Sequence, residues 1–429
     1  MYWNVFWIPN PVALISSPIG VLAVLCFVAA FFFLIAELTK AKLFQYIPPL
    51  LFIYATPVFL NNLDVIPSDS IVYPGLSAYA LPAFIVLMLI KVNIPAVIKV
   101  MGKGVLVMLM GTLGVMVGAV VAYAIVHPWL SPDAWQGYGA LAGSWIGGTA
   151  NMAAAAEILG TSEEQFGLAI IADNVIYIVW LPMLLLSRDF ADRFNKWARV
   201  PEDRIAAMDA AAELHVEEDA APTMPQYLFL IAVVIGVVWV GRALAPPVAE
   251  TLSATADSIG ALSAEASRIV RWLLAIPLAV TSALSGETTV RILLVTTIAL
   301  VLSVTPVSKL PNSTAMGTAL VYVFVAGMGA RASVSGLAEA PMFVLGAFIW
   351  IFIHGLFCLA GAWLFRVDIH SVAIASAANI GAAASAPIVA AHHRPSLVPV
   401  SILMALLGYA MGNYLAPLTG QLARMAAGQ

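Results

Sequence analysis

Long apolar stretches alternate with short polar breaks along almost the whole chain. Most stretches approach the roughly 20 residues that a helix needs to cross a bilayer. The apolar runs are continuous, whereas strands of a membrane β-barrel alternate apolar and polar residues. The pattern therefore predicts an all-α polytopic membrane protein. About thirteen transmembrane helices are expected, at residues 18–38, 47–62, 71–90, 103–127, 137–159, 165–187, 226–246, 268–286, 291–308, 315–330, 341–365, 371–391 and 397–422.

Composition agrees with this pattern. The 429 residues are 62% hydrophobic and 10% charged, with a mean hydropathy of +0.98, whereas soluble domains carry about 25% charged residues. Residues 188–219 hold five basic and nine acidic side chains, so this polar segment carries the whole net charge of −4. The chain thus consists of two apolar halves joined by one polar segment. It has no basic tract for nucleic acid, which we exclude as a partner.

The two apolar halves share short motifs in the same order, for example residues 146–151 and 380–385. We interpret residues 18–187 and 268–422 as two six-helix repeats. The polar segment, one linker helix and a connecting loop fill residues 188–267. Six spans return the chain to its starting side and the linker helix then crosses, so the repeats are expected to be inverted. Inverted repeats are typical of secondary transporters with a site near the membrane midplane.

The fifth span of each repeat is the least helical. Its sequence is GSWIGGTANMAAAAE at 143–157 and SAANIGAAASAPIVAA at 376–391. Small and polar residues at this depth predict a broken helix, which is tolerated only where it lines a cavity or binds a ligand. Close packing of small residues is the alternative explanation. The candidate binding residues in the two segments are Ser144, Gly147, Gly148, Thr149, Asn151, Asn379, Gly381 and Ser385.

Asp173 and Asn174 lie in the middle of the next span, residues 165–187. An ionisable side chain at this depth is costly and is by default a functional candidate. Asp173 could bind sodium or carry a proton, or it could form a purely structural hydrogen bond to a broken helix. The equivalent positions of the second repeat, Gly408 and Tyr409, are not ionisable. A single coupling site is therefore expected.

Two further residues have a structural and a functional explanation. Trp145 lies next to the first break and could line a pocket or simply pack. His354 lies in the middle of a span, where a hydrogen bond between helices is favoured over a proton relay.

The segments GSWIGGTANMAAAAEILG, IIADNVIYIVWLP and SAANIGAAASAPIVAA together resemble the family known as domain of unknown function 819. The resemblance implies a place in the cation/proton antiporter and anion transporter superfamily. It implies a homodimer in the bacterial inner membrane, with a scaffold domain and a core in which two discontinuous helices cross. The core would move as an elevator. Asp173 and Asn174 would occupy the position of an ion-binding pair, as possible sodium ligands.

Two departures from the antiporter pattern bear on function. The order here is Asp then Asn, and the lysine that some antiporters use in the second repeat has no counterpart. We therefore expect a secondary active transporter of a small organic solute, with an anion favoured, coupled to sodium or protons. Sodium/proton antiport without an organic substrate is the alternative.

An enzyme is not expected, because HExxH, GxSxG and P-loop motifs are absent from the sequence. An intramembrane enzyme or receptor is a remote alternative. We expect no cofactor other than a possible sodium ion, and a small-molecule solute and membrane lipid as partners. The distribution of Lys and Arg favours an N-terminus outside and a C-terminus inside the cell.

Overall fold

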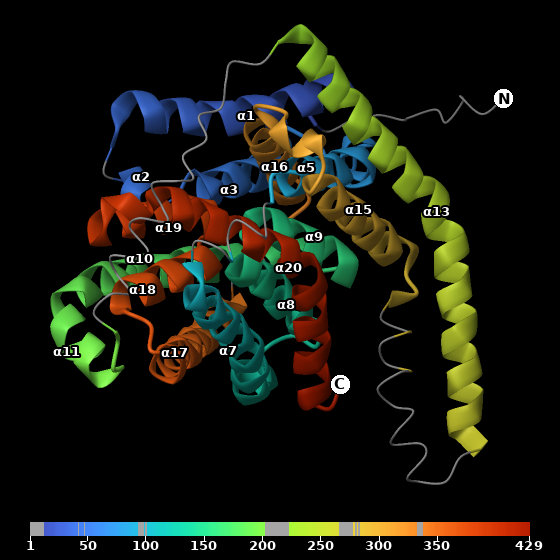
Figure 1. The fold of residues 1–429 in the computed structure, drawn as a ribbon. Coiled ribbons are helices and arrows are strands. Elements are labelled where there is room, and N and C mark those ends of the chain that lie inside the picture. Colours follow the sequence, from blue (N-terminus) through green and yellow to red (C-terminus); the bar gives the residue numbers. More distant parts are fainter. Residues whose placement is uncertain are drawn as a thin grey trace.

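The computed structural model describes residues 13–41, 43–46, 48–92, 98, 101–201, 223–265, 278, 281, 284–332 and 338–429. These residues form helices and no strands, which confirms the all-α prediction (Figure 1). Seven of the described helical stretches are long and apolar enough to cross a membrane, so the chain is an integral membrane protein. They are Pro18–Thr39, Val72–Leu89, Lys103–Trp129, Glu163–Trp197, Met224–Ala264, Ala340–Phe365 and Pro395–Ala426.

The described α-helices follow the predicted spans closely in most places. They are α1 Pro18–Thr39, α2 Leu43–Tyr46, α3 Pro49–Asn62, α4 Val72–Gly75, α5 Leu81–Leu89, α7 Lys103–Val126, α8 Ala134–Gly147, α9 Thr149–Leu159, α10 Glu163–Leu186, α11 Ala191–Trp197, α13 Met224–Glu265, α15 Glu287–Ser303, α16 Ser313–Gly329, α17 Ala340–Phe365, α18 Ile369–Asn379, α19 Ala382–His393 and α20 Val398–Ala426. A π-helical turn, Leu76–Ala80, joins α4 to α5, and a 3₁₀ turn, Ser187–Phe190, joins α10 to α11. The predicted span 268–286 lies largely outside the described residues.

One group of helices is centred on α5 and α16, which run antiparallel. A Cβ atom at Gly317 of α16 would lie 2.8 Å from Met88 of α5, and one at Gly327 would lie 2.7 Å from Leu76 just before α5. Helices α1, α3, α13 and α15 belong to the same group, which we call the α5–α16 group. Within it, α13 packs against α15, where Gly241 faces Val295.

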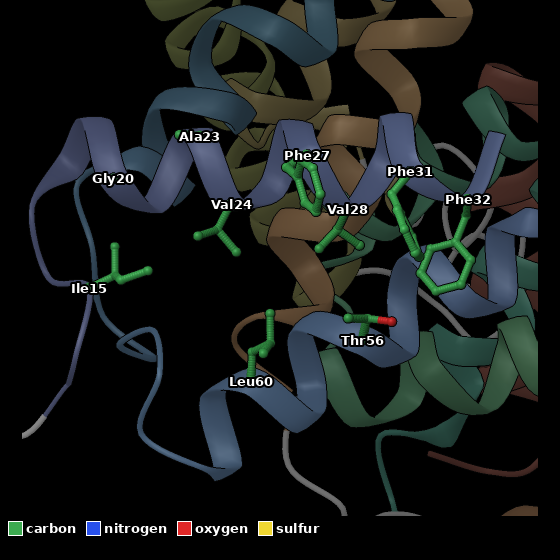
Figure 2. Close-up of a pocket in the computed structure, with 10 residues that line it drawn as sticks. All are labelled: Ile15, Gly20, Ala23, Val24, Phe27, Val28, Phe31, Phe32, Thr56 and Leu60. Carbon is green, nitrogen blue, oxygen red and sulfur yellow. The ribbon is translucent and has the colours of Figure 1, made fainter. Parts of the chain in front are cut away.

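An apolar groove of about 580 Å³ lies in the α5–α16 group, between α1 and α3 (Figure 2). Its lining includes Phe27 and Phe31 of α1 and Leu60 of α3, with Thr56 as a polar member. None of the candidate binding residues lines this groove. It is therefore a surface feature of the apolar helices and not the candidate site.

The second group is centred on α7 and α17, which also run antiparallel. A Cβ atom at Gly111 of α7 would lie 2.9 Å from Cys358 of α17, and Gly118 faces Trp350. Because glycines line this seam, the two backbones approach closely. Helices α8 to α10 and α18 to α20 pack around this pair, and we call the whole the α7–α17 group. It contains every predicted binding residue.

The segments 137–159 and 371–391, each predicted as one span, fold instead into helical hairpins. In the first hairpin, α8 and α9, Thr161 Oγ1 donates a hydrogen bond to Gln136 O (3.4 Å). In the second, α18 and α19, His370 Nδ1 lies 3.0 Å from His393 Nδ1. The ends of an unbroken helix of this length would lie more than 30 Å apart. The expectation of crossed discontinuous helices is therefore wrong, because each break reverses the chain and does not let it continue across.

The two hairpins enter the α7–α17 group from opposite ends. The first opens at the end where α10 begins, which we call the first end; there Ser162 Oγ donates to Asp133 Oδ2 (3.2 Å). The second opens at the end where α10 finishes, the second end; there His393 Nε2 lies 2.9 Å from Leu184 O. Since α10 connects the two ends, the hairpins point toward each other and their turns face the middle of the group.

Candidate functional site

The turns of the two hairpins touch each other. Gly148, the turn of the first hairpin, has φ +83°, a conformation that favours glycine. A Cβ atom on Gly148 would lie 2.8 Å from the Cβ atom of Ala382, which begins α19 directly after Gly381. Helices α9 and α19 both begin at this contact, and α8 and α18 end there. Positive and negative ends of helix dipoles therefore converge on one place.

Asp173 of α10 binds the first hairpin just before its turn. Its carboxylate accepts hydrogen bonds from Ser144 Oγ (3.0 Å) and from Trp145 Nε1 (2.8 Å). Ser144 is buried and Trp145 is fully buried. The structure thus brings together two of the predicted residues, Ser144 and Asp173. It also shows that Trp145 binds the carboxylate and does not only pack.

Asp173 has no basic counterion in the part of the chain that the structure describes. The ion pairs found there are Arg331–Glu163, at 3.0 Å, and Arg291–Glu287, at 4.0 Å. Neutral donors alone therefore satisfy the Asp173 carboxylate in the described structure. An ionisable side chain at this depth is costly and is by default a functional candidate, and the two hydrogen bonds also match the structural alternative, in which Asp173 holds the broken helix.

Asn174 of α10 offers a second acceptor beside Asp173. Its Nδ2 donates to Ile170 O (2.8 Å), while its Oδ1 is buried and makes no hydrogen bond within the described residues. Leaving such an acceptor unpaired costs about 1–3 kcal/mol. One helical turn further along, Tyr177 lies close to Gly381 of the second hairpin. One face of α10 therefore reaches both hairpins.

Asn151 of α9 turns toward α20 and does not contact Asp173. Its Nδ2 donates to Tyr409 O and to Asn413 Oδ1, both at 3.0 Å. Asn413 in turn donates to Thr296 Oγ1 of α15 (2.9 Å). This buried chain connects the first hairpin, through α20, to the α5–α16 group. A cavity of about 10 Å³, roughly the size for one water, lies beside Asn151, Tyr409 and Asn413.

The predicted residues of the second hairpin mainly hold that hairpin in place. With its amide oriented to satisfy both atoms, Asn379 accepts from Thr112 N (3.1 Å) of α7 and donates to Ala375 O (3.0 Å). Ser385 Oγ donates to Ala377 O (2.9 Å) and so closes the turn. These residues therefore shape the turn and position it against α7.

His354 contributes to the same support. Its Nδ1 lies 2.9 Å from Gly111 O of α7, and its Nε2 lies 2.9 Å from Ser376 Oγ of α18. Trp180 Nε1 of α10 donates to the same hydroxyl (3.0 Å). The favoured explanation, a hydrogen bond between helices, is therefore confirmed.

Tyr409 of α20 was not among the predicted site residues, yet it contacts both turns. Its ring carbon Cε1 lies 3.1 Å from the Cβ position of Gly148, and its hydroxyl faces the backbone N–H of Ala383. The predicted repeat already pointed to this position. Tyr409 lies 235 residues after Asn174, and the same distance in sequence separates the matching residues Pro182 and Pro417. By the predicted repeat, Tyr409 corresponds to Asn174, and its larger side chain reaches the turn of the first hairpin.

The fold and the site define a helical integral membrane protein in which two hairpins meet between packed helices. Residues 23–426 match the family described as "Protein of unknown function (DUF819)". The chain belongs to this family, which confirms the resemblance seen in the sequence motifs. Among curated proteins, the uncharacterized membrane protein YjcL of Bacillus subtilis (strain 168) is similar, with 24% identity over 376 residues. The match covers 85% of this chain and 87% of YjcL.

Proposed function

We propose that this protein is a secondary active transporter that binds a small organic solute, favoured to be an anion, where the two hairpins meet. The observation that supports this most is the contact between Gly148 and Ala382, formed by hairpins that enter from opposite ends. The N-termini of α9 and α19 suit an anion. Asp173, Asn174 and the carbonyl ends of α8 and α18 suit a sodium ion.

We propose a revised form of the inverted repeat. Among the helices that the structure describes, each repeat would have five crossing helices and one hairpin: α1, α3, α5, α7 and α10 in the first, and α13, α15, α16, α17 and α20 in the second. Helix α13 is then the first span of the second repeat and not a separate linker. It packs against α15 as α1 packs against α3. Five crossings are an odd number, so the second repeat begins on the opposite side without a further span.

The revised arrangement also gives a clearer orientation. Successive spans alternate between the two ends, and this places most of the described basic residues at the second end. Loops rich in Lys and Arg lie on the cytoplasmic side of a membrane, so the second end is proposed to face the cytoplasm. Arg291, Arg331 and Arg424 occupy the first end, so both termini are proposed to lie outside. The described basic residues of the second end are Lys40, Lys91, Lys103, Arg188, Arg193, Lys196, Arg199, Lys309, Arg366 and Arg394.

We propose that alternating access arises from an elevator motion of the α7–α17 group along the α5–α16 group. The Asn413–Thr296 bond joins the two groups and would have to break as they slide. A homodimer would hold the α5–α16 groups of two copies fixed. The motion would carry the hairpin contact, with its ligands, from one side of the bilayer to the other.

The test compares Asp173→Asn with the matched control Asp257→Asn, a change at an exposed position of α13. Thermal stability of each purified protein is measured in sodium, in potassium and with a panel of organic anions. A ligand at 100 times its Kd stabilises the folded state by about 2.7 kcal/mol. Sodium should stabilise the original protein and the control but not Asp173→Asn. An equal sodium effect in all three would overturn the role of Asp173.

Sodium/proton antiport without an organic solute is the second candidate, supported by the carboxylate of Asp173, which has no basic counterion among the described residues. Reconstituted vesicles that contain a pH-sensitive dye distinguish the two functions. A sodium gradient should change the internal pH without any organic solute if the protein is an antiporter. If sodium stabilises the protein but moves no protons, solute transport is favoured.

A further inference from the structure

A short surface segment contacts both ends of the second hairpin. It comprises the 3₁₀ turn Ser187–Phe190 and helix α11, and we call it the surface segment. Arg188 Nη1 donates to His392 O near the end of α19 (2.6 Å). Asn195 Oδ1 accepts from the backbone N–H of Ile369, the first residue of α18 (3.2 Å). The surface segment therefore holds the base of this hairpin from outside.

The surface segment exposes a row of large apolar side chains. Phe190 and Trp197 are 58% and 52% exposed, and Phe194 lies between them with its ring 5.4 Å from that of Trp197. Phe194 and Trp197 lie three residues apart on one face of α11, and Phe190 ends the 3₁₀ turn before it. Phe194 is half-buried, because it also packs against the core of the α7–α17 group. Met183 and Leu186, both exposed, extend this row onto α10. Exposed apolar residues therefore continue along the sequence from the last turns of α10 into the surface segment.

The charges around this row are mainly positive. Arg188, Arg193, Lys196 and Arg199 are exposed, and the acidic residues of the same stretch are Asp189 and Asp192. The other seven acidic residues that make 188–219 negative come after residue 201. The acid excess of the whole segment therefore does not describe residues 188–199. Aromatic side chains flanked by Lys and Arg are typical of helices that lie on anionic lipid.

We propose that the surface segment binds the headgroups of anionic phospholipids and thereby holds the base of the second hairpin closed. Phe190 and Trp197 insert below the headgroups, while Arg193 and Lys196 contact the phosphates. The lipid fixes α11, and Asn195 transmits this constraint to the start of α18. The consequence for transport rests on the proposed function, because only there does the second hairpin line the site.

Hydrogen exchange in lipid nanodiscs tests the proposal. The protein is compared in discs of phosphatidylcholine alone and in discs that also contain phosphatidylglycerol. The anionic lipid should slow exchange in residues 369–393 and leave residues 149–159 of the first hairpin unchanged. Equal slowing in both hairpins, or in neither, would overturn the proposal. Inorganic phosphate added to neutral discs should have no effect, and an effect there would show a phosphate site in place of a lipid site.

Charge reversal identifies the contact. Each basic residue near an anionic surface strengthens the binding of anionic lipid about fivefold. Arg193→Glu with Lys196→Glu should therefore weaken the binding of phosphatidylglycerol to the surface segment more than about 25-fold. Lys103→Glu with Lys309→Glu reverses as many exposed charges at the same end but outside the surface segment, and it should leave the slowing of exchange in residues 369–393 unchanged. Phe190→Ser keeps every charge and should weaken attachment as well. If the first pair and Phe190→Ser bind anionic lipid like the control, the assignment is wrong.

Asn195→Ala separates lipid binding from its consequence. Neither Arg193 nor Lys196 changes, so lipid binding measured by native mass spectrometry should persist. The slowing of exchange in residues 369–379 of α18 should disappear, because the bond to Ile369 is lost, while Arg188 still binds His392 O at the end of α19. Persistent slowing would show that the lipid acts on the hairpin by another route. These measurements need no transport, so their failure is distinct from failure of the Asp173 test.

Discussion

The two hairpins share an architecture but differ in how tightly they pack. In the first, every residue of α9 from Ala150 to Ala156 is buried. In the second, α19 exposes Ala384, Ile388 and Ala391 along one face. The second helix of the first hairpin is therefore part of the core, whereas the second helix of the other hairpin is partly exposed.

Glycines account for the tight packing of the first hairpin. A Cβ atom at Gly147 of α8 would lie 2.6 Å from Gly408 O of α20, and one at Gly139 would lie 3.1 Å from the Cα atom of Gly420. Side chains at these positions would push the helices apart. The second hairpin depends instead on separate hydrogen bonds, such as those of Ser376 and His393. Regions with fewer buried contacts open at lower free energy, so the second hairpin is expected to move more easily.

The largest predicted effect follows from filling the glycine seam. In Gly408→Val, the new side chain meets the backbone carbonyl of Ile146, which cannot rotate away. Overpacking of this kind costs about 3 kcal/mol, and we expect a marked loss of thermal stability in detergent. Ala384→Val adds comparable volume on the exposed face of α19 and should change stability by less than about 0.5 kcal/mol. Similar losses in the two variants would show that the hairpins are packed alike.

A smaller effect is predicted for the polar chain that joins the first hairpin to α20. Asn151→Ala leaves Asn413 Oδ1 without its donor, and Asn413→Ala removes one of the two α20 acceptors of the Asn151 amide, with Tyr409 O remaining. Each change should destabilise by about 1–3 kcal/mol. The double variant should lose less than the sum, with a coupling of about 0.5–3 kcal/mol in thermal unfolding. Strict additivity would mean that this bond does not hold the first hairpin.

Much of this fold could be predicted from hydrophobic lengths. The span expected at 18–38 is α1, Pro18–Thr39, and that at 341–365 is α17, Ala340–Phe365. The length of the segment 137–159 gave a wrong prediction, because a mostly apolar segment of 23 residues can cross a bilayer once or turn back at a glycine. Composition does not distinguish these outcomes. The positive φ of Gly148 does, and Gly148 lies against Ala382 of the other hairpin, a contact that the sequence does not show.

The candidate site could be predicted only in part, for a related reason. Asp173 was found because an acid in an apolar span is unusual, and Ser144 because it lies beside the break. Tyr409 and Asn413 resemble ordinary span residues, and their roles depend on which hairpin lies against α20. Asn151 and Asn379 were correctly placed near the breaks, but their amides bind α20 and α7. The sequence therefore showed which polar residues lie near the breaks, but their hydrogen-bond partners depend on how the helices pack.

The smallest predicted effect concerns the turn of the second hairpin. Ser385→Ala removes one hydrogen bond, to Ala377 O, and adds no bulk. Loss of such a bond costs about 0.5–1.5 kcal/mol. Because the second hairpin packs less tightly, this cost should appear as local opening. Hydrogen exchange should become faster in residues 369–393, with little change in the midpoint of thermal unfolding.

Ser401→Ala is the matched control for this change. Ser401 is buried in α20 and donates to Val398 O (2.7 Å), so the same kind of bond is lost outside either hairpin. Exchange in residues 369–393 should then stay as in the original protein. If Ser385→Ala instead accelerates exchange in residues 149–159 to the same extent, the hairpins open together. The two turns would then form one cooperative unit, and the difference in packing would not let the second hairpin open independently of the first.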